Sequence, residues 1–223
     1  MTAAIAIFVK TPGLSPLKTR LAAGMGNAAA SRFHVLAAAA VAAAARGADD
    51  VVQGYWAVAE EAGCDAGIWR GFPALWQGEG GLGQRLDRIY ASLMKRHDRV
   101  LLVGADMPAL TPALIRQAVA RLDDPDCPYT LGPAEDGGFW LFGGRAPVPA
   151  ETWAAVPYST SGTADALRYA LRNRGGLSLL PTRRDIDTAD DLPPLRDALR
   201  GLAEPSPEQQ RLAAWLEEVR LPG

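Results

Sequence analysis

The sequence predicts a three-layer α/β/α fold, in which helices cover both faces of a mostly parallel, mixed sheet. Short β-branched or aromatic segments alternate with helical segments along the 223 residues, and such alternation is typical of βαβ units. The apolar run Val100–Val103 indicates a strand buried on both faces. Ligands of open α/β sheets bind at the carboxyl ends of the strands. The Gly104-Ala105-Asp106 turn after this strand is therefore the first candidate for a site.

Local patterns predict the other elements. Strands are expected at residues 5–9, 51–58, 74–76, 129–131, 139–142 and 177–180, which are short runs between turn-forming residues. Helices are expected over 28–46, from the glycine-rich loop 78–83 to residue 95, from Thr111 onward, and over 163–172 and 207–220. Thr111 is a typical N-cap, Pro112 suits the first helical position, and Gly47 is a typical helix end.

Composition predicts one globular domain, residues 1–223, with 196–223 as a C-terminal helical extension. The net charge of −2 and the lack of a basic run argue against a nucleic-acid partner. The apolar run Val35–Ala45 falls short of the roughly 20 residues of a membrane span. It is mostly alanine, so a packed helix is expected instead of a span.

The cysteines and histidines exclude several classes of site. Cys64 and Cys127 are far apart and have no CxxC partner, which indicates neither zinc nor a disulfide framework and fits a reducing cytoplasm. No signal-peptide pattern precedes the first strand, so a cytoplasmic location is expected. His34 lies among apolar helix residues and His97 near a charged helix end, so a Ser-His-Asp hydrolase is not expected.

The loop after the first strand has the composition of a phosphate-binding loop. Its chemically informative residues are Lys10, Pro12, Gly13, Ser15, Lys18, Thr19 and Arg20. Positive side chains and free backbone N–H groups near a helix start favour phosphate. The 13–19 pattern resembles a P-loop but lacks the second glycine, and prolines remove N–H donors, so a Walker A mechanism is rejected. An exposed basic turn is the alternative.

Gly78-x-Gly80-x-x-Gly83 nearly matches a dinucleotide-binding fingerprint, with Asp106 as the acidic residue. It follows the third predicted strand instead of the first, however, and Asp106 is followed by Met-Pro, which suits a metal site or a turn better than a ribose contact. We therefore expect a loop that shapes a nucleotide or substrate pocket. An NAD-dependent oxidoreductase and a flexible surface loop stay open as alternatives.

Three later segments carry further candidates. Asp136, Gly137 and Gly138 follow a predicted strand, and glycines let backbone approach a ligand closely, although an Asp-Gly hairpin turn also explains them. The hydroxyl-rich 158–163 segment could bind an acceptor phosphate or sugar, or cap a helix. In 185–192, capping of a short helix by Asp187 or Thr188 accounts for most of the acidic residues, but less well for Asp185.

Five motifs occur in an order that resembles a known bacterial family. They are Lys10-x-Pro12 with Lys18-Thr19-Arg20-Leu21, Gln77-Gly78-Glu79-Gly80-x-Leu82-Gly83-x-Arg85-Leu86, Gly104-x-Asp106-x-Pro108-x-Leu110, Leu131-Gly132-Pro133-Ala134-x-Asp136-Gly137-Gly138, and Asp185-Ile186-Asp187-Thr188. Over residues 5–195 the chain resembles the glycosyltransferase-like family known as radical-SAM/selenodomain-associated transferases. That family is similar to nucleotide-diphospho-sugar transferases of the GT-A type, and more distantly to guanylyltransferases. Its members usually carry glycine where this chain has Ser15.

The resemblance implies a nucleotide lying over the first loop and the 78–83 loop. Asp106, Lys18 and Arg20 would be catalytic, and Asp106, Asp185 and Asp187 would hold Mg²⁺ or Mn²⁺. The nucleotide-binding set would be Lys10, Pro12, Gly13, Ser15, Lys18, Thr19, Gly80, Gly83 and Arg85. The acceptor set would be Asp136, Gly137, Gly138, Ser159 and Thr160.

The sequence as a whole predicts a metal-dependent transferase that moves a glycosyl or nucleotidyl group from a nucleotide or nucleotide-sugar to a small acceptor. Such transfers depend on positioning and charge neutralisation. A dinucleotide-dependent oxidoreductase is one alternative. A non-catalytic binding protein on a retired transferase fold is another.

Overall fold

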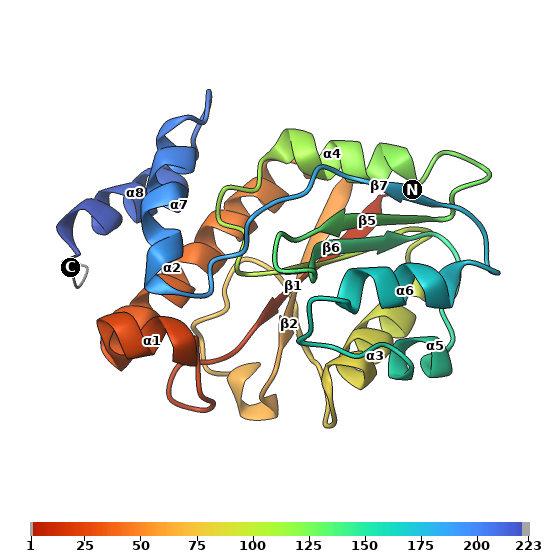
Figure 1. The fold of residues 1–223 in the computed structure, drawn as a ribbon, viewed down its shortest axis with the longest axis horizontal. Coiled ribbons are helices and arrows are strands. Elements are labelled where there is room, and N and C mark those ends of the chain that lie inside the picture. The colour runs from red at the N-terminus through yellow and green to blue at the C-terminus, as the bar shows by residue number, and fades with distance from the viewer. Residues whose placement is uncertain (1, 220–223) are drawn as a thin grey trace.

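The computed structural model describes residues 2–219 and contains a seven-stranded mixed sheet (Figure 1). The strand order is β3-β2-β1-β4-β6-β5-β7. The strands are β1 (Ala3–Val9), β2 (Val52–Val58), β3 (Ala74–Trp76), β4 (Val100–Gly104), β5 (Tyr129–Pro133), β6 (Phe139–Gly144) and β7 (Leu177–Leu179). Strand β6 runs antiparallel to its neighbours β4 and β5, and the other pairs are parallel. The predicted fold class is therefore confirmed.

Strands β1 and β4 form the centre of the sheet, because their residues are apolar toward both faces. Val100 to Val103 are each at most 2% exposed, as expected for parallel strands covered on both sides. Ala6 pairs with Leu102 and Phe8 with Gly104. The two strands consequently end side by side, and the loops that follow them start next to each other.

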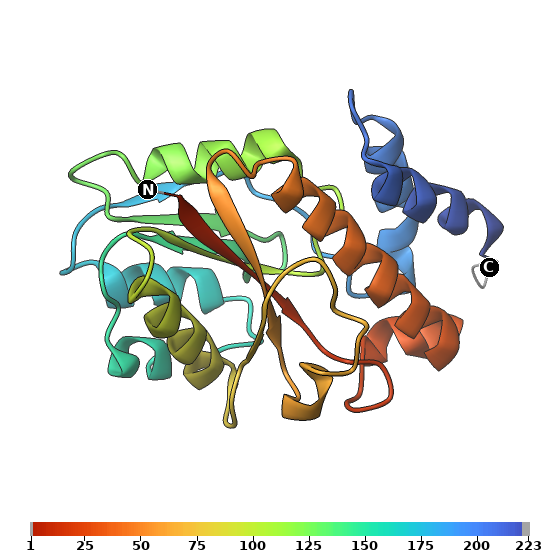
Figure 2. The same ribbon diagram turned by 180° about the vertical axis from the view of Figure 1, so that it is seen from behind.

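Helices cover both faces of this sheet (Figures 1 and 2). Helices α2 (Asn27–Arg46) and α4 (Pro112–Arg121) pack on one face. Helices α3 (Leu82–Met94), α5 (Ala150–Ala154) and α6 (Thr163–Leu171) pack on the other, around the buried Trp153. The Oγ1 of Thr111 accepts a hydrogen bond from the backbone N–H of Leu114 at the start of α4, which confirms the predicted cap.

Several short helices were absent from the sequence prediction. They are α1 (Thr19–Met25), α5 and the 3₁₀ segment Glu61–Gly63. The short helix expected after Asp187 or Thr188 is present as the 3₁₀ segment Ala189–Asp191 followed by α7 (Leu192–Arg200). Helices this short are marginal in isolation and depend on tertiary packing. Helix α7 packs with α1, α2 and α8 (Pro207–Glu218) in a separate apolar cluster around Phe33 and Trp215. Helix α8 was expected to reach Arg220, which lies outside the described residues.

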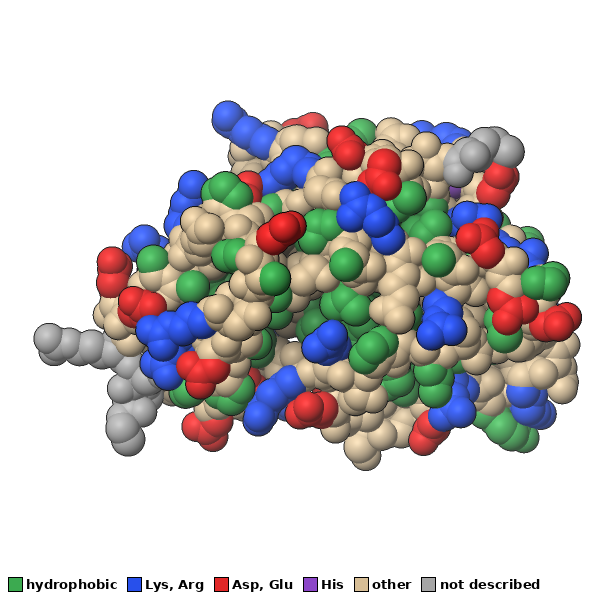
Figure 3. Space-filling view, turned by 90° about the horizontal axis from the view of Figure 1, so that it is seen from above, with side chains coloured by type: hydrophobic (Ala, Val, Ile, Leu, Met, Phe, Trp, Pro, Cys, Tyr) green, Lys and Arg blue, Asp and Glu red, His purple; other side chains and the backbone are tan. Residues whose placement is uncertain are grey.

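Helix α2 is the one helix among residues 2–219 that is long and apolar enough to cross a membrane by length and composition. In the fold, 61% of its apolar window is buried. It contacts β1, β2, α4 and α8, which makes it a core helix, as predicted. Figure 3 shows basic and acidic side chains interspersed across the face seen there, with hydrophobic side chains between them.

Truncation of the central strand is expected to cost far more stability than truncation at the sheet edge. Leu101 is fully buried and Leu179 is 45% exposed. Leu101→Ala should lower the free energy of unfolding by about 2–5 kcal/mol, because it removes apolar contacts and leaves a cavity. Leu179→Ala, the matched control, should change it by about 0.5 kcal/mol or less. Urea denaturation measures both, and equal losses would contradict the assignment of β4 as the central buried strand.

Candidate functional site

A cavity of about 660 Å³ opens at the carboxyl ends of β1 and β4. The strand order reverses between these two strands, and this is the position at which open α/β sheets bind ligands. The volume lies within the usual range for ligand pockets. Its lining residues are Phe8, Val9, Lys10, Leu17, Lys18, Thr19, His34, Gln77, Gly80, Leu82, Arg85, Gly104, Ala105, Asp106, Ser159 and Asp187. We call this space the large cavity.

Lys18 and Asp106 form an ion pair in the large cavity. The Lys18 Nζ lies 2.8 Å from the Asp106 Oδ1 and also donates to the backbone carbonyl of Ile186. The Lys18 side chain is 8% exposed, whereas the Asp106 side chain is 43% exposed. A buried ammonium is held in place by its partners. The contact therefore joins the first loop, the end of β4 and the segment after β7.

Backbone strain is concentrated at the same place. Among the described residues, the two non-glycine residues with positive φ are Lys18 (42°) and Ser159 (61°). Each such conformation costs roughly 1–3 kcal/mol, and strain of this kind clusters at ligand sites. Both residues line the large cavity, although they come from loops about 140 positions apart in the sequence. The strain supports a functional role for the cavity.

The first loop is anchored by side chains that the sequence analysis left unassigned. The backbone N–H of Thr11 donates to the Glu60 carboxylate (2.8 Å), and the Trp69 indole N–H donates to the Thr11 hydroxyl (3.0 Å). His34 Nε2 lies 3.1 Å from the Lys10 carbonyl. Burial lowers the pKa of His34, which favours the neutral imidazole. His34 therefore contacts the backbone of the first loop, and only the tertiary fold places it beside Lys10.

The glycines of the 78–83 loop have different roles: Gly80 borders the large cavity, and Gly83 allows close packing. Gly78 (φ 76°) and Gly80 (φ 102°) adopt left-handed backbone, which glycine accommodates. The buried Gln77 donates from its amide to the Ala57 carbonyl at 2.8 Å, which fixes the loop start. Gly83 packs beneath α5, and a Cβ there would lie 2.7 Å from the Trp153 carbonyl. Gly80 thus borders the cavity, whereas Gly83 allows close packing.

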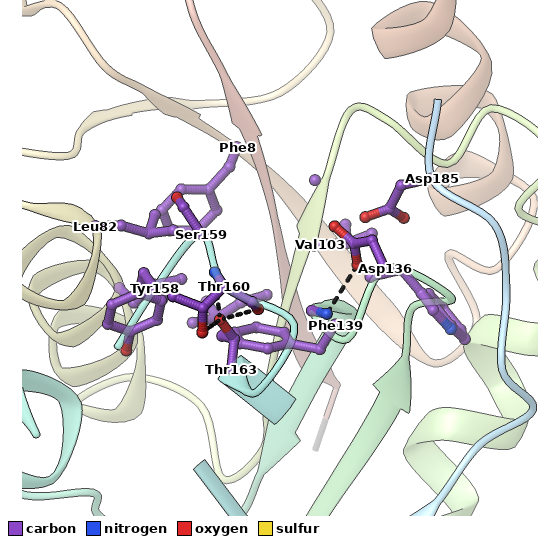
Figure 4. A pocket seen from close by; sticks show the side chains of 15 residues that line it. Phe8, Leu82, Val103, Asp136, Phe139, Tyr158, Ser159, Thr160, Thr163 and Asp185 are labelled. Carbon is purple, nitrogen blue, oxygen red and sulfur yellow. Dashed lines mark hydrogen bonds between the residues drawn. The ribbon is translucent and has the colours of Figure 1, made fainter. Parts of the chain in front are cut away.

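A second space of about 200 Å³, which we call the small cavity, shares lining residues with the first. Figure 4 shows the side chains that line it. Both cavities are bordered by Phe8, Leu82, Gly104 and Ser159. The remaining lining residues are Leu86, Leu102, Val103, Asp136, Gly138, Phe139, Trp140, Tyr158, Thr160, Thr163 and Asp185. Most of this wall is apolar, and its two carboxylates face one another across one end (Figure 4).

These two carboxylates differ in their surroundings. Asp136 lies in the β5–β6 hairpin, where its Oδ1 accepts from the Gly138 N–H at 2.8 Å. The predicted hairpin turn is thus confirmed, and Asp136 also borders the small cavity. Asp185 Oδ1 is buried and has no hydrogen-bond partner within residues 2–219. Burial, followed by the nearby charges of Asp106 and Asp136, raises the pKa of Asp185 to about 7.

A divalent ion in these cavities would have to take part of its ligands from the substrate. No cluster of three or more His, Cys, Asp or Glu residues suited to a metal occurs within residues 2–219. Mg²⁺ commonly binds one or two carboxylates together with phosphates and water. Asp106 and the unpartnered Asp185 could supply that pair. Asp187 lines the large cavity, yet its Oδ2 accepts from Arg20 at 2.6 Å, so its role as a ligand stays a prediction.

Thr188 takes the predicted N-cap position of the acidic segment, but the Asp191 carboxylate accepts the backbone hydrogen bonds there instead of the Asp187 or Thr188 side chain. The Asp191 Oδ2 accepts from the backbone N–H groups of Asp187 (3.0 Å) and Thr188 (2.8 Å) and from the Thr188 hydroxyl (2.9 Å). These bonds help to lower the pKa of Asp191. This turn therefore explains Asp191 but leaves Asp185 free to face the small cavity.

The fold brings together most of the predicted site residues. The large cavity is bordered by Lys10, Lys18, Thr19, Gly80, Arg85, Asp106, Ser159 and Asp187. The small cavity is bordered by Asp136, Gly138, Ser159, Thr160 and Asp185. Predicted residues that border neither cavity are Pro12, Gly13, Ser15, Arg20, Gly83 and Gly137. Gly137 instead meets the backbone of Ser161, where a Cβ would lie 1.9 Å from the carbonyl oxygen.

Comparison with known proteins gives a family match and a shared fold. The profile of a family described as "Uncharacterized protein conserved in bacteria (DUF2064)" matches residues 39–160. No curated protein matches the chain by sequence. A protein from Desulfovibrio desulfuricans G20, provisionally named a nucleotide-diphospho-sugar transferase, superposes with a TM-score of 0.82. It is 22% identical, and the alignment covers 98% of this chain and 99% of the other.

Two further solved structures share the fold at lower similarity. CMP:2-keto-3-deoxy-manno-octonic acid synthetase complexed with CTP has a TM-score of 0.59 and 15% identity, covering 90% of this chain and 99% of the other. Rv0371c from Mycobacterium tuberculosis H37Rv has a TM-score of 0.58 and 18% identity, covering 87% and 97%. A manganese complex of Rv0371c also matches, with a TM-score of 0.51 and 14% identity over 96% and 98%. These matches establish a nucleotide-diphospho-sugar transferase fold.

Asp185 is expected to make stability depend on pH. Its carboxyl group ionises near pH 4 in the unfolded chain and at about 7 in the folded protein. The folded state therefore holds the proton more tightly, and stability falls as the pH rises from 4 to 7. Asp185→Asn removes the titrating carboxyl group and therefore this loss of stability at higher pH. Its Tm relative to the wild type should rise between pH 4 and pH 8 in metal-free buffer.

Scanning calorimetry at several pH values measures this difference. The exposed Asp98→Asn is the matched control, and its Tm difference from the wild type should stay nearly constant over the same range. A Tm difference for Asp185→Asn that is independent of pH would show that the buried carboxyl does not titrate as described.

Proposed function

The chain belongs to the DUF2064 family of bacterial proteins, and we propose that it is a metal-dependent transferase that uses a nucleotide or a nucleotide-sugar. The observation that carries this proposal is the buried Lys18 ammonium, held in strained backbone against Asp106 where the strand order reverses. The shared fold with nucleotidyl and nucleotide-sugar transferases supports it.

The nucleotide occupies the large cavity in this proposal. Lys10, Lys18 and Arg85 border it from the first loop and from α3, so three cationic groups face the space where phosphates would lie. Transfer from a nucleotide breaks a bond to a phosphate oxygen, and the electron pair of that bond leaves on the phosphate. Fixed positive groups stabilise this developing charge.

Asp106 and Asp185 hold the divalent ion in this proposal, and Mg²⁺ or Mn²⁺ would there neutralise phosphate charge and orient the leaving group. The manganese complex of the structurally similar Rv0371c supports this choice of ion. Lys18 is paired with the same Asp106 carboxylate. Arg20, which is largely exposed and paired with Asp187, would contribute from the cavity rim.

The acceptor occupies the small cavity in this proposal, where Asp136, Ser159 and Thr160 border it. Both cavities share Phe8 and Ser159, so a group bound in one meets a group bound in the other. The dinucleotide alternative gains less support. The 78–83 loop follows β3, an edge strand, whereas the dinucleotide fingerprint follows the first strand of its fold.

A thermal-shift panel tests the proposed ligand class. GDP, UDP, CTP, UDP-glucose and NADH are added separately, with and without Mg²⁺ or Mn²⁺. A ligand at about 100 times its Kd adds roughly 2.7 kcal/mol to stability, so one nucleotide or nucleotide-sugar should raise Tm in a metal-dependent way. A rise with NADH alone would favour the oxidoreductase instead. Metal-dependent binding with no turnover of any donor would favour a non-catalytic binding protein.

Asp106→Asn should abolish the metal dependence of that Tm rise while preserving the fold, because asparagine keeps the shape but loses the charge. Asp98→Asn, on an exposed turn, is the matched control and should behave as the wild type. An unchanged metal-dependent rise in Asp106→Asn would remove Asp106 from the proposed site.

Lys18→Met should weaken the binding of the nucleotide or nucleotide-sugar that the panel identifies. Hydrogen bonds to charged groups contribute about 1.5–3 kcal/mol, so the Kd measured by calorimetry should rise about 10- to 150-fold. The exposed Lys95→Met serves as the control for the loss of one positive charge elsewhere. A Kd within about twofold of the wild type, in a variant that still unfolds cooperatively, would contradict the role of Lys18.

A further inference from the structure

We infer that the C-terminal helices α7 and α8 complete the candidate site, and that Gln209 in α8 is a positioning residue that holds the Asp106 turn opposite Lys18. The consequence of this arrangement for catalysis rests on the proposed function. The contacts that carry it are those of the chain itself, and they can be measured without any substrate.

The Gln209 side chain joins α8 to the turn that carries Asp106. Its Nε2 donates to the carbonyl oxygens of Pro108 (3.0 Å) and Leu110 (2.9 Å), which lie 101 and 99 positions earlier in the sequence. Its Oε1 accepts from the backbone N–H of Ser206 at 2.9 Å. Gln209 is only 3% exposed, so water has little access to these hydrogen bonds. Both ends of the amide are used, and the orientation of the side chain is therefore fixed.

The backbone of the Asp106 turn is held on both sides of the carboxylate. Before it, the N–H of Ala105 donates to the carbonyl of Phe8 in β1 at 3.3 Å. After it, only the buried Met107 separates Asp106 from the first carbonyl group that Gln209 binds. The turn therefore has one support in the central sheet and another in α8.

The same group of helices also holds Lys18. The Lys18 ammonium donates to the carbonyl of Ile186, and the Ile186 side chain is buried in the separate apolar cluster of α1, α2, α7 and α8. Leu21, which follows Lys18 in α1, is fully buried in that cluster too. The C-terminal helices thus support both partners of the ion pair, Lys18 through the apolar cluster and Asp106 through Gln209.

Helix α8 is itself anchored to the rest of the protein. Figures 1 and 2 show α7 and α8 beside α1 and α2 at one end of the molecule. Glu208 Oε1 accepts from the Arg46 guanidinium at the end of α2 at 2.6 Å, and Trp215 is buried in the apolar cluster. The Ser206 hydroxyl caps α8 by accepting from the backbone N–H of Gln209 at 3.2 Å. Gln209 therefore extends from a capped and packed helix.

The ion pair depends on this support because its two partners differ in exposure. The Lys18 side chain is buried, whereas the Asp106 side chain is half-exposed. A half-exposed carboxylate can turn toward water, and ion pairs that water reaches contribute little by themselves. The position of the Asp106 carboxylate is therefore set by its backbone, and Gln209 holds that backbone.

NMR of lysine ammonium groups can observe the ion pair directly, because the chain has only three lysines, Lys10, Lys18 and Lys95. Proton–nitrogen spectra are recorded for the full chain with chelator and without nucleotide. The Lys18 signal is assigned by its loss in Lys18→Met, and Asp106→Asn gives its position without the ion pair. A Lys18 signal that exchanges with water too fast to be seen, or that does not move in Asp106→Asn, would overturn the inference.

Two variants of Gln209 remove its donors. Gln209→Leu has no polar atom for the turn, so the Lys18 signal should shift from its wild-type position toward that of Asp106→Asn. Gln209→Glu keeps the length of the side chain and the acceptor for the Ser206 N–H but lacks the N–H donors. It should give the same shift, which keeps the test decisive if Gln209→Leu does not fold.

Gln210→Leu is the matched control on the same helix. The Gln210 side chain is exposed and donates to the Pro205 carbonyl at 3.3 Å, so its loss should leave the Lys18 signal at the wild-type position. An unchanged Lys18 signal in a Gln209 variant that still unfolds cooperatively would overturn the inference. An equal shift in Gln210→Leu would also overturn it, since the effect would then belong to α8 in general.

A binding measurement separates this inference from the proposed function. For the nucleotide or nucleotide-sugar that the thermal-shift panel identifies, Gln209→Leu should raise the Kd about 2- to 30-fold, and Gln210→Leu should leave it unchanged. A shifted Lys18 signal with an unchanged Kd would support positioning by Gln209 and count against a role of the ion pair in binding. Failure of the panel would leave the NMR result readable, because no nucleotide or metal is needed for it.

Discussion

The ion pair between the buried Lys18 ammonium and the half-exposed Asp106 carboxylate is the contact on which the site depends. It joins three segments that are distant in sequence, because the Lys18 ammonium also binds the Ile186 carbonyl. A charge this buried has no alternative partner in water, so its position is specified by the protein. The strained backbone at Lys18 shows that the surrounding packing holds this geometry against a local cost.

That contact is possible because β1 and β4 are adjacent and end in register. Phe8 pairs with Gly104, so the first loop and the Asp106 turn emerge side by side. Apolar cores on both faces hold the strands in place. Glu60, Trp69 and His34 then hold the first loop in position through hydrogen bonds to Lys10 and Thr11. The site thus consists of the carboxyl ends of two buried strands and of loops that are held by hydrogen bonds.

Charge is distributed unevenly across this edge. Within the described residues, cationic side chains border the large cavity together with the carboxylates of Asp106 and Asp187, whereas the charged residues that border the small cavity are Asp136 and Asp185. Because low-dielectric walls strengthen electrostatic interactions, adjacent spaces of different charge can bind two different kinds of molecule in contact. This arrangement suits a transferase, which must hold a phosphate-bearing donor and an acceptor together while keeping them distinguishable. The shared border at Phe8 and Ser159 is where they would meet.

Local sequence was sufficient for the fold class and for the strands, since apolar runs such as Val100–Val103 and caps such as Thr111 depend on near neighbours. It also singled out loops that border the two cavities. Short helices such as α1 and α5 escaped prediction, because packing stabilises them more than their own residues do. The 78–83 glycines illustrate the same limit, since Gly80 borders the large cavity while Gly83 packs against Trp153 and Tyr158, which only the tertiary fold brings there.

What the sequence by itself determined was the order of strands and helices along the chain, and which turns carry lysines and carboxylates. Periodicity, capping and glycine placement are properties of a few consecutive residues. Tertiary structure alone decided that Lys18 meets Asp106, that His34 supports Lys10, and that Asp185 faces a cavity without a partner. Those facts depend on which strands are neighbours and on what is buried between them, and neither is a local property of the chain.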